Sequence, residues 1–362
     1  MAGIDTVSKW DVDTPALVVD LDLLEQNISH MSQFFRDKGV SWRPHTKGQK
    51  IPEIAHLQIA AGAIGITCAK LSEAEVMAPK GIRDILVANQ VVGEHKASRL
   101  AKLLDIADVM VAVDSLVNAE QLSQAADSRG QRLRVLIEVD NGMGRAGVPP
   151  GEPTLRLAKA LDKLPGLRLV GLMAWEAHCL GLPPVERQSC CDEAVGRLVA
   201  TANMCRDAGL PIEIVSCGGT VTFKFTAGIP GVTEIQAGGG IFADVLYESW
   251  GIEHPFALTV VSTVTSRPTA DRVIVDAGRK ALSVDVAMPR PQGVPNVDTV
   301  ALGAEHGIIR LTESNDTIQV GDKVEWIVGY SDTTVCLHDE MIGVREDQVE
   351  VAWQVLGRGK MT

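Results

Sequence analysis

Short runs of apolar and β-branched residues alternate with longer stretches of helical periodicity along the first two thirds of the chain. One run, Pro15 to Asp20, comes first and is followed by eight others. These eight are Ser41 to Lys47, Gly65 to Ala69, Asp84 to Asn89, Asp108 to Asp114, Leu133 to Asp140, Leu167 to Trp175, Ile212 to Gly219 and Thr233 to Gly238. Strands that alternate with helices in this way predict a parallel sheet or barrel.

The stretches between these runs carry apolar residues at helical spacing, and most of them end near a Gly or Pro. The predicted helices are Ile51 to Ala61, Glu73 to Pro79, Lys96 to Ile106, Val117 to Ala126, Thr154 to Lys163 and Val185 to Ala208. Eight strand–helix units predict an α/β fold, a (β/α)8 barrel of the TIM type.

After about Tyr247 the pattern changes to strands separated by turns. The predicted strands are Ala257 to Thr265, Arg272 to Asp276, Val324 to Val328 and Val349 to Val355. We therefore expect residues 21–247 to form the barrel, and residues 1–20 and 248–362 to form a β domain.

Composition narrows the function classes. The chain has 362 residues, 46% of them hydrophobic, and a formal net charge of −12. An acidic chain argues against a nucleic-acid or anionic-membrane surface, so we expect a small-molecule substrate and neither a nucleic-acid nor a membrane partner. The first 20 residues carry charges throughout and no run of ~18 apolar residues follows, which predicts a cytoplasmic protein.

The chain contains seven cysteines and no CxxC pair. An odd number of cysteines spread over a long chain is typical of reduced thiols in a reducing compartment. We expect them to be mostly core residues.

Lys47 ends the first of the eight runs, and barrel active sites lie where strands end at the C-terminal face. A lysine there can form a Schiff base with a carbonyl cofactor. The seventh and eighth runs end in the glycine-rich segments Ser216 to Thr220 and Gln236 to Gly240, which can present backbone N–H groups to a phosphate. A lysine and two glycine-rich phosphate-binding segments in one barrel suggest pyridoxal phosphate. A Schiff-base aldolase that acts on a sugar phosphate is the alternative.

Two more side chains stand at predicted strand ends. Arg145 follows the fifth of the eight strands and could contact a cofactor ring or a substrate carboxylate, whereas an ion pair with Glu138 or Asp140 is the alternative. Trp175 ends the sixth strand and could pack against the cofactor or lie in the core.

Together these motifs resemble the D-threonine aldolase and D-serine dehydratase group, which are pyridoxal phosphate enzymes with the alanine-racemase-like barrel of fold type III. The resemblance spans nearly the whole chain. It rests on Asp13 to Leu17, Arg43 to Lys47, Asp140 to Val148, Ser216 to Thr220, Glu234 to Gly238, Asp276 to Gly278, Glu305 to Gly307 and Leu337 to Asp339.

The resemblance implies that Lys47 is the Schiff-base lysine, that Arg145 lies by the pyridine ring, and that glycines after the last two strands hold the phosphate. Trp175 stands where relatives usually carry a tyrosine. The candidate cofactor-binding residues are Lys47, Arg145, Trp175, Ser216, Gly218, Gly219, Thr220, Gln236, Gly238 and Gly239.

Relatives typically bind a divalent metal through a His-x-Cys or His-x-Asp pair in the β domain. Here Tyr330 occupies the histidine position and Asp332 the second position, and a neutral phenol is a poor ligand for a hard divalent ion. Asp332, with a contribution from His306, is then the candidate metal ligand. Tyr330 could serve instead as an acid or base, or could simply pack with its hydroxyl satisfied. The candidate catalytic residues are Lys47, Tyr330 and His45.

These features favour a homodimeric pyridoxal phosphate lyase that cleaves a D-3-hydroxy amino acid to glycine, or a related amino acid, and an aldehyde. A dehydratase of the D-serine or 3-hydroxy-D-aspartate type is the first alternative. A racemase that uses Lys47 and Tyr330 is another. A non-catalytic carrier of pyridoxal phosphate is less favoured, because in larger relatives the C-terminal domain completes the active site of a partner subunit.

Overall fold

The computed structural model describes residues 7–362, and the chain divides into two compact units. The barrel unit consists of His30–Lys47, Ile54–Gly238 and Lys360–Thr362. The β unit consists of the described part of Met1–Ser29, with Gly48–Glu53 and Gly239–Gly359. The domain boundaries expected from the sequence stay a prediction, and residues 1–6 of that β domain lie outside the described residues.

The barrel unit contains an eight-stranded parallel sheet in the order β2-β9-β8-β7-β6-β5-β4-β3. Its strands are β2 (Ser41–Trp42), β3 (Ile66–Cys68), β4 (Asp84–Gln90), β5 (Asp108–Val113), β6 (Leu133–Glu138), β7 (Leu167–Met173), β8 (Ile214–Cys217) and β9 (Glu234–Ile235). The two ends of this order meet at a parallel bridge between His45 and Thr67. Each of the eight predicted runs contains one of these strands, so the predicted α/β barrel is confirmed.

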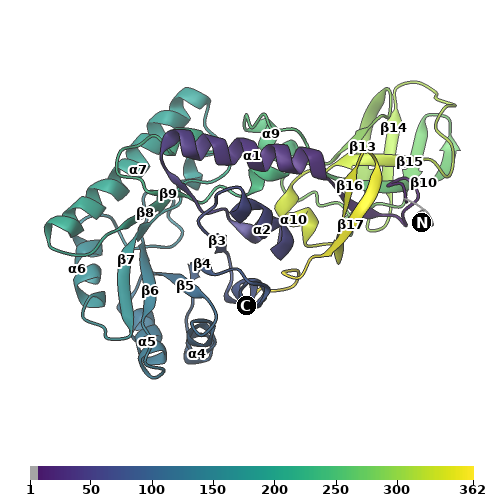
Figure 1. The fold of residues 1–362 in the computed structure, drawn as a ribbon. Helices are drawn as coiled ribbons and strands as arrows, with labels where there is room; N and C mark the ends of the chain where they lie inside the picture. The colour runs from purple at the N-terminus through teal and green to yellow at the C-terminus, as the bar shows by residue number, and fades with distance from the viewer. Residues whose placement is uncertain (1–6) are drawn as a thin grey trace. The chain divides into compact units, whose positions relative to one another are not determined.

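Helices cover the outside of this sheet (Figure 1). They are α3 (Leu71–Met77), α4 (Glu94–Leu103), α5 (Leu116–Asp127), α6 (Glu152–Leu161) and α7 (Pro184–Asp207). The inside of the sheet is apolar and is filled by a cluster of buried side chains from successive strands, as in a packed barrel. This cluster is Leu86, Met110, Ala112, Leu136, Val170 and Met173.

All six predicted helices are present, including α2 (Pro52–Ala60). Four α-helices were not predicted: α1 (Leu21–Lys38) and the short α8 (Phe223–Thr226), α9 (Val245–Ser249) and α10 (Ser331–Val335). The sequence does contain a residue that marks the start of α1. Asp20 accepts a hydrogen bond from the backbone N–H of Leu23 at 3.0 Å, which is the pattern of an N-terminal cap.

The β unit contains a nine-stranded sheet. Its strands are β1 (Ala16–Asp20), β10 (Leu258–Thr269), β11 (Arg272–Val275), β12 (Arg290–Gln292), β13 (Val297–Leu302), β14 (Gly307–Leu311), β15 (Lys323–Ile327), β16 (Glu340–Arg345) and β17 (Gln348–Gln354). The N-terminal strand β1 lies between β10 and β16. Four strands, β12, β13, β14 and β16, were not predicted; β12 and most of β13 are exposed, so neither has a continuous buried run.

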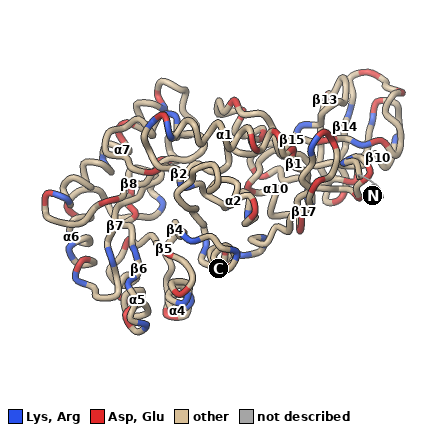
Figure 2. The backbone as a smooth tube through the Cα atoms, viewed as in Figure 1, with Lys and Arg blue, Asp and Glu red and all other residues tan. Residues whose placement is uncertain are grey.

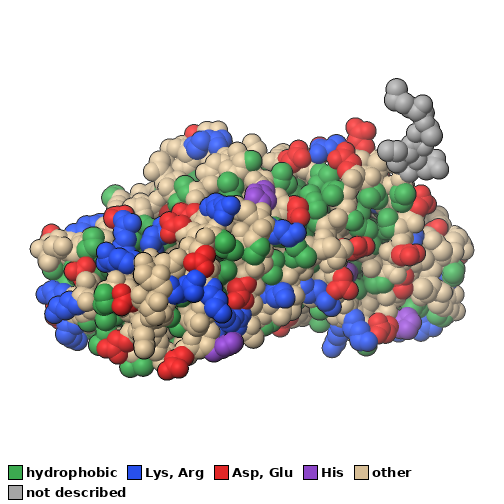
Figure 3. Space-filling view, turned by 60° about the horizontal axis from the view of Figure 1, so that its bottom comes forward, with side chains coloured by type: hydrophobic (Ala, Val, Ile, Leu, Met, Phe, Trp, Pro, Cys, Tyr) green, Lys and Arg blue, Asp and Glu red, His purple; other side chains and the backbone are tan. Residues whose placement is uncertain are grey.

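Charged residues of both signs are distributed along the chain in both units (Figure 2). On the face shown in Figure 3, acidic and basic side chains are interspersed. Among the described residues, every helix is either too short or too polar to cross a membrane.

The prediction of seven reduced cysteines is wrong for one pair. Cys179 and Cys190 form a disulfide, because the short helix η3 (Ala177–Cys179) and α7 bring their Cα atoms to 5.8 Å. The other five cysteines are free thiols, and four of them are buried, which agrees with the core positions expected for them.

Arg43 follows β2 and carries a guanidinium that is almost completely buried. Its Nε lies 3.0 Å from Glu234 Oε2 and its Nη1 lies 2.7 Å from Asp84 Oδ1. Glu234 begins β9 and Asp84 begins β4, so one cation links three strands of the barrel. Gly65 makes room for this cation, because a Cβ atom there would lie 2.7 Å from Nη1.

We predict that Arg43→Ala lowers the free energy of unfolding by about 3 to 5 kcal/mol, because it leaves a buried carboxylate without its partner. Arg168→Ala is the matched control, because Arg168 pairs with Glu213 at 3.0 Å at the exposed surface of the same unit. That change should cost about 0 to 1 kcal/mol. Urea unfolding of both variants measures the difference, and equal losses would contradict the structural role of Arg43.

Candidate active site

Lys47 lies in the short helix η1 (Thr46–Gly48), directly after β2. Its side chain is half-buried, and its backbone N–H donates to Nδ1 of His45 at 3.3 Å. The hydroxyl of Thr46 donates to the carbonyl oxygen of Thr67 at 3.0 Å. The backbone around Lys47 is therefore fixed to β3 at the C-terminal edge of the barrel, the edge where such barrels place their active sites.

Arg145 lies in the loop after β6, with its side chain 54% exposed, and its Nη2 is 3.5 Å from Glu138 Oε1. Glu138 is buried and also accepts a hydrogen bond from Gln90 at 2.5 Å. The ion pair within the loop, one of the two alternatives drawn from the sequence, is thus present. A role for Arg145 beside the cofactor ring stays a prediction.

A turn around Asp140 gives this loop its shape. Asp140 Oδ1 accepts from the backbone N–H of Gly144 at 3.0 Å and from that of Gly142 at 3.1 Å. The hydrogen bond from Gly144 is the main reason that the pKa of Asp140 lies below its usual value. A carboxylate held in this way stays ionised and keeps the segment before Arg145 in one conformation.

The segments after β8 and β9 are joined by buried polar contacts. Gln236 Nε2 donates to Ser216 Oγ at 2.9 Å, and both side chains are buried. Gly218 has a φ of +76°, and a Cβ atom there would lie 2.9 Å from both Ile235 and Thr226. The chain can therefore make this turn only with glycine.

Two more of the predicted glycines allow close packing. A Cβ atom on Gly219 would collide with the indole of Trp175, and one on Gly238 would collide with the backbone carbonyl of His45. Trp175 thus covers the loop after β8, and the loop after β9 packs on the segment that leads to Lys47. The structure thus brings Trp175 next to Gly219, and His45 next to Gly238.

Glu176, which was not among the predicted site residues, lies beneath the loop after β8. It is fully buried and accepts from the hydroxyl of Thr222 at 2.5 Å and from the N–H of Gly218 at 3.4 Å. Burial raises the pKa of Glu176 to about 7. Its signal in the sequence was an acidic residue next to Trp175 at the end of a barrel strand, which is where functional side chains concentrate.

The N–H of Gly219 donates to the hydroxyl of Thr222 at 3.0 Å. Because the N–H of Gly218 points at Glu176, both glycine donors are paired inside the protein. In the structure these glycines shape the loop, and the predicted role of their N–H groups toward a phosphate stays a prediction. Thr220, the next predicted residue, is buried in the same loop.

A phosphate site at the turns after β8 and β9 stays a prediction. Both turns are tightly packed, so neither has room for additional side-chain atoms. Burial of Glu176 raises its pKa and so favours the uncharged acid, which reduces repulsion of a phosphate anion. Lys47 supplies an amine on the same edge of the barrel.

The remaining candidates lie in the β unit. The hydroxyl of Tyr330 donates to Asp332 Oδ2 at 2.7 Å, and Asp332 lies in the first turn of α10 (Ser331–Val335). A Cβ atom on Gly48 would collide with Asp332 Oδ1. Asp332 therefore packs against the residue that directly follows Lys47 in the chain.

The ring of Tyr247 lies next to both the phenol of Tyr330 and the start of η4 (Gly239–Ile241). The ring of Tyr330 packs edge to face on Tyr247, with 5.9 Å between ring centres. A Cβ atom on Gly239 would collide with the hydroxyl of Tyr247. Gly239, the first residue of this segment of the β unit, is thus packed against Tyr247.

Asp332 does not fit the metal pair of the relatives. One of its oxygens accepts from the phenol of Tyr330, and a neutral phenol is a poor ligand for a hard divalent ion. His306, the other residue considered, is exposed. His338, farther along the chain, is bonded through Nε2 to the carbonyl of Ala281 at 2.8 Å. We therefore assign no metal to these side chains.

Comparison with known families gives two matches. Residues 19–244 match the family described as alanine racemase, N-terminal domain. Residues 257–344 match the family described as putative serine dehydratase domain.

Individual proteins match over most of the chain. A D-threonine aldolase from an Arthrobacter species is 36% identical, covering 96% of this chain and 93% of that protein. A 3-hydroxy-D-aspartate aldolase from Paracoccus denitrificans is 34% identical, covering 97% and 93%. A D-threo-3-hydroxyaspartate dehydratase from a Delftia species is 35% identical, covering 76% and 73%. The crystal structure of D-threonine aldolase from Filomicrobium marinum is 36% identical, with a TM-score of 0.94 and 99% of both chains covered.

We predict that Gly219→Ala weakens binding of pyridoxal phosphate roughly tenfold or more, because a methyl group forced against the Trp175 indole costs about 1 to 3 kcal/mol. Gly228→Ala is the control, because a Cβ atom at Gly228 would meet no other atom within 4 Å. Titration of each apoprotein with the cofactor, followed by absorbance, gives the dissociation constants. Unchanged binding in Gly219→Ala would separate this loop from the phosphate.

Proposed function

This chain belongs to the pyridoxal-phosphate-dependent family that joins an alanine racemase-like barrel to a serine dehydratase-like β domain, and from that premise we propose that it is an aldolase. It would cleave a D-3-hydroxy amino acid to glycine, or a related amino acid, and an aldehyde. Support comes from the relatives named as D-threonine aldolase and 3-hydroxy-D-aspartate aldolase, which match over almost the whole chain.

In this proposal the barrel unit holds the cofactor. Lys47 binds its aldehyde, the turns at Gly218 and Gly238 shape the phosphate site, and Trp175 and Arg145 contact the ring system. Bound pyridoxal phosphate supplies an electron sink for the electrons of the broken Cα–Cβ bond.

The observation that carries the reaction is the hydrogen bond of 2.7 Å from the Tyr330 hydroxyl to Asp332. Cleavage of the Cα–Cβ bond requires removal of the proton on the substrate's 3-hydroxyl. The phenol oxygen of Tyr330 can accept that proton while its own proton passes to the Asp332 carboxylate. The pair thereby acts as a general base: the phenol stays neutral, and the carboxylate takes up the proton.

The position of Asp332 supports this assignment. It packs against Gly48 of the same unit, which restrains the carboxylate that accepts the proton of Tyr330. His45, whose ring accepts the N–H of Lys47, serves as a positioning residue for that lysine in this proposal.

A dehydratase is the second candidate, because the Delftia relative is named as one. It would expel the 3-hydroxyl and release ammonia and a 2-oxo acid. A racemase, which would use Lys47 and Tyr330 on opposite faces of the substrate, would change only the configuration at Cα. The three reactions differ in their products.

We also propose that the enzyme is a cytoplasmic homodimer. The acidic sequence supports the location, and the resemblance to two-domain relatives supports the dimer. Light scattering coupled to gel filtration tests the assembly, and a monomer at enzymatic concentrations would exclude it.

We predict that the purified holoenzyme converts D-3-hydroxy amino acids to an aldehyde and glycine in equal amounts. A panel of D and L substrates, with aldehyde, glycine, ammonia and 2-oxo acid measured together, tests this. Lys47→Ala is the blank, because the amine that holds the cofactor is absent. Ammonia with a 2-oxo acid would replace the aldolase by a dehydratase, and inversion at Cα alone would indicate a racemase.

We further predict that activity survives removal of divalent metals with EDTA, whereas Tyr330→Phe lowers kcat by ~10²-fold or more, the usual scale for a lost acid–base group. Asp332→Asn should lower kcat in the same direction, because the amide cannot accept the proton from Tyr330. Cys336→Ala, at the end of the same helix, serves as the control with unchanged kcat.

Loss of activity on chelation that added Zn²⁺ or Mn²⁺ restores would contradict the metal-free assignment. A kcat of Tyr330→Phe within twofold of the parent would remove the phenol from the reaction. Cofactor absorbance, recorded for each variant, separates both results from a loss of pyridoxal phosphate.

A further inference from the structure

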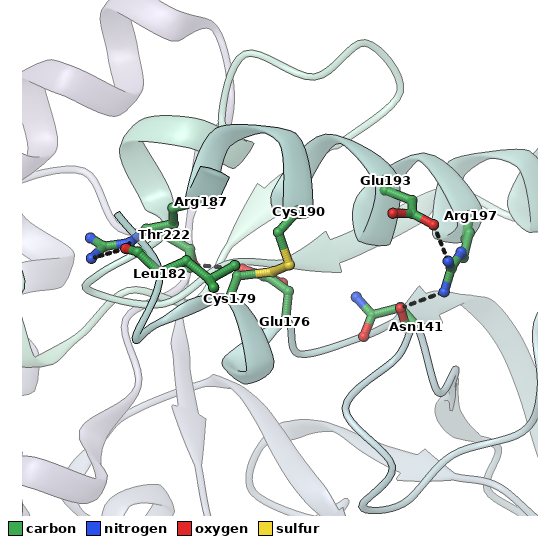
Figure 4. The surroundings of a disulfide bond; sticks show 9 residues. All are labelled: Asn141, Glu176, Cys179, Leu182, Arg187, Cys190, Glu193, Arg197 and Thr222. Carbon is green, nitrogen blue, oxygen red and sulfur yellow. Dashed lines mark hydrogen bonds and ion pairs between the residues drawn. A yellow bond between two sulfur atoms is a disulfide. The ribbon is translucent and has the colours of Figure 1, made fainter. Parts of the chain in front are cut away.

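A group of three potential metal ligands lies in the barrel unit, in the segment after β7. They are His178 and Cys179 of η3 and Cys190 of α7, and one ligand atom from each lies within 4.8 Å of the others. Cys179 is buried, Cys190 is half-buried and His178 is exposed. Figure 4 shows the two cysteines joined between the turn and the helix.

We propose that, when this disulfide is reduced, Cys179, Cys190 and His178 bind one soft divalent cation of the Zn²⁺ class. Two thiolates and an imidazole are a zinc donor set, and three protein ligands leave the fourth position to water. Bond lengths of about 2.0 to 2.3 Å around a tetrahedral ion place the ligand atoms roughly 3.3 to 3.8 Å apart. Binding therefore requires the two sulfur atoms to move apart after reduction and the imidazole to lie within this distance of both.

The two states of the site exclude each other, because the disulfide uses both sulfur atoms. A thiol reductant such as dithiothreitol supplies two electrons and two protons, which opens the disulfide to two thiols and oxidises the reductant to its own disulfide. Zn²⁺ then replaces the two thiol protons, which are released to solvent. The site therefore holds η3 against α7 by a covalent bond or by a metal ion.

The loop after β6 supports the site from a second side. Gly142 packs against the imidazole, since a Cβ atom there would lie 3.1 Å from His178 Nε2. The ionised Asp140 of the same loop interacts electrostatically with His178. Negative charge beside an imidazole ligand favours binding of a cation.

Asn141 provides an independent indication of a missing ligand. Its side chain is 1% exposed, yet neither Oδ1 nor Nδ2 has a hydrogen-bond partner. Buried amides are rarely left in this state unless a water or ion completes them. In Figure 4 its amide group is drawn in the same surroundings as the disulfide, and a metal-bound water can donate to its Oδ1.

Cations near the site are already paired. Arg197 of α7 binds Glu193 and donates to the backbone carbonyl of Asn141 at 3.5 Å. Arg187 donates to the carbonyl of Leu182 at 3.0 Å. The carboxylate of Glu193 thus offsets the charge of Arg197, which limits the repulsion between Arg197 and a bound Zn²⁺.

The test uses the full-length holoenzyme, reduced and then freed of reductant and metal under argon. Native mass spectrometry after addition of Zn²⁺ should show one ion per chain, with the mass of zinc minus two protons. The oxidised holoenzyme, which needs no mutation, should bind none at the same concentration. Cysteine alkylation followed by peptide mapping should show Zn²⁺ protecting Cys179 and Cys190.

Cys190→Ser should weaken Zn²⁺ binding at least about 100-fold, since loss of even an outer partner of a zinc ligand costs about 10- to 100-fold. His178→Gln should weaken it less, because both thiolates stay. Cys336→Ala, outside the site, should bind as the parent does. Equal zinc binding by the oxidised and reduced proteins, or by Cys190→Ser and the parent, would overturn the proposal, and so would the absence of zinc from the reduced parent.

Discussion

The buried guanidinium of Arg43 is the constraint on which the barrel unit depends. An arginine cannot lose its charge in a protein, so its burial requires carboxylates, and Glu234 and Asp84 supply them from the starts of β9 and β4. With these contacts, strands β2 and β9 pair in the register that places Ser41 opposite Glu234. Once that register is set, the N–H of His45 reaches the carbonyl of Gln236 at 3.1 Å, and Gly238 packs under His45. Lys47 and the turn at Gly238 are thus placed by the same ion pairs.

The pair of Tyr330 and Asp332 changes what the β unit can contribute to catalysis. In relatives with a histidine at the first position, a metal ion can act as a Lewis acid on the substrate hydroxyl. A phenol bonded to a carboxylate offers proton transfer instead, without a bound cation. Such a pair suits removal of a hydroxyl proton, as in aldol cleavage, better than departure of the whole hydroxyl group, which gains from electrophilic assistance. The substitution therefore bears on the choice between the two lyase reactions.

The sequence predicted the barrel well because each strand carries its own signal. Runs such as Asp108 to Asp114 are apolar, bounded by turn residues and separated by helices, so local pattern and fold agree. It predicted the β unit less well, since β13 alternates weakly and is largely exposed. For Arg145 the sequence left two alternatives, contact with a cofactor or substrate and an ion pair with Glu138, and the structure contains the ion pair. The burial of Glu176 and the approach of Cys179 to Cys190 depend on how loops pack, and no periodicity in the sequence encodes those contacts.

The segment after β7 shows how one irregular stretch can serve several purposes at once. Trp175 covers Gly219, Glu176 turns inward to Gly218 and Thr222, and Cys179 reaches α7. Successive residues point to different sides because the backbone here is neither strand nor regular helix, so neighbouring side chains need not share a face. Whatever holds Cys179 to α7 also restrains the chain three residues from Glu176. The turn at Gly218 and the thiol pair therefore share one structural support, and a change in the bonding of the thiols acts on the same backbone that positions Glu176.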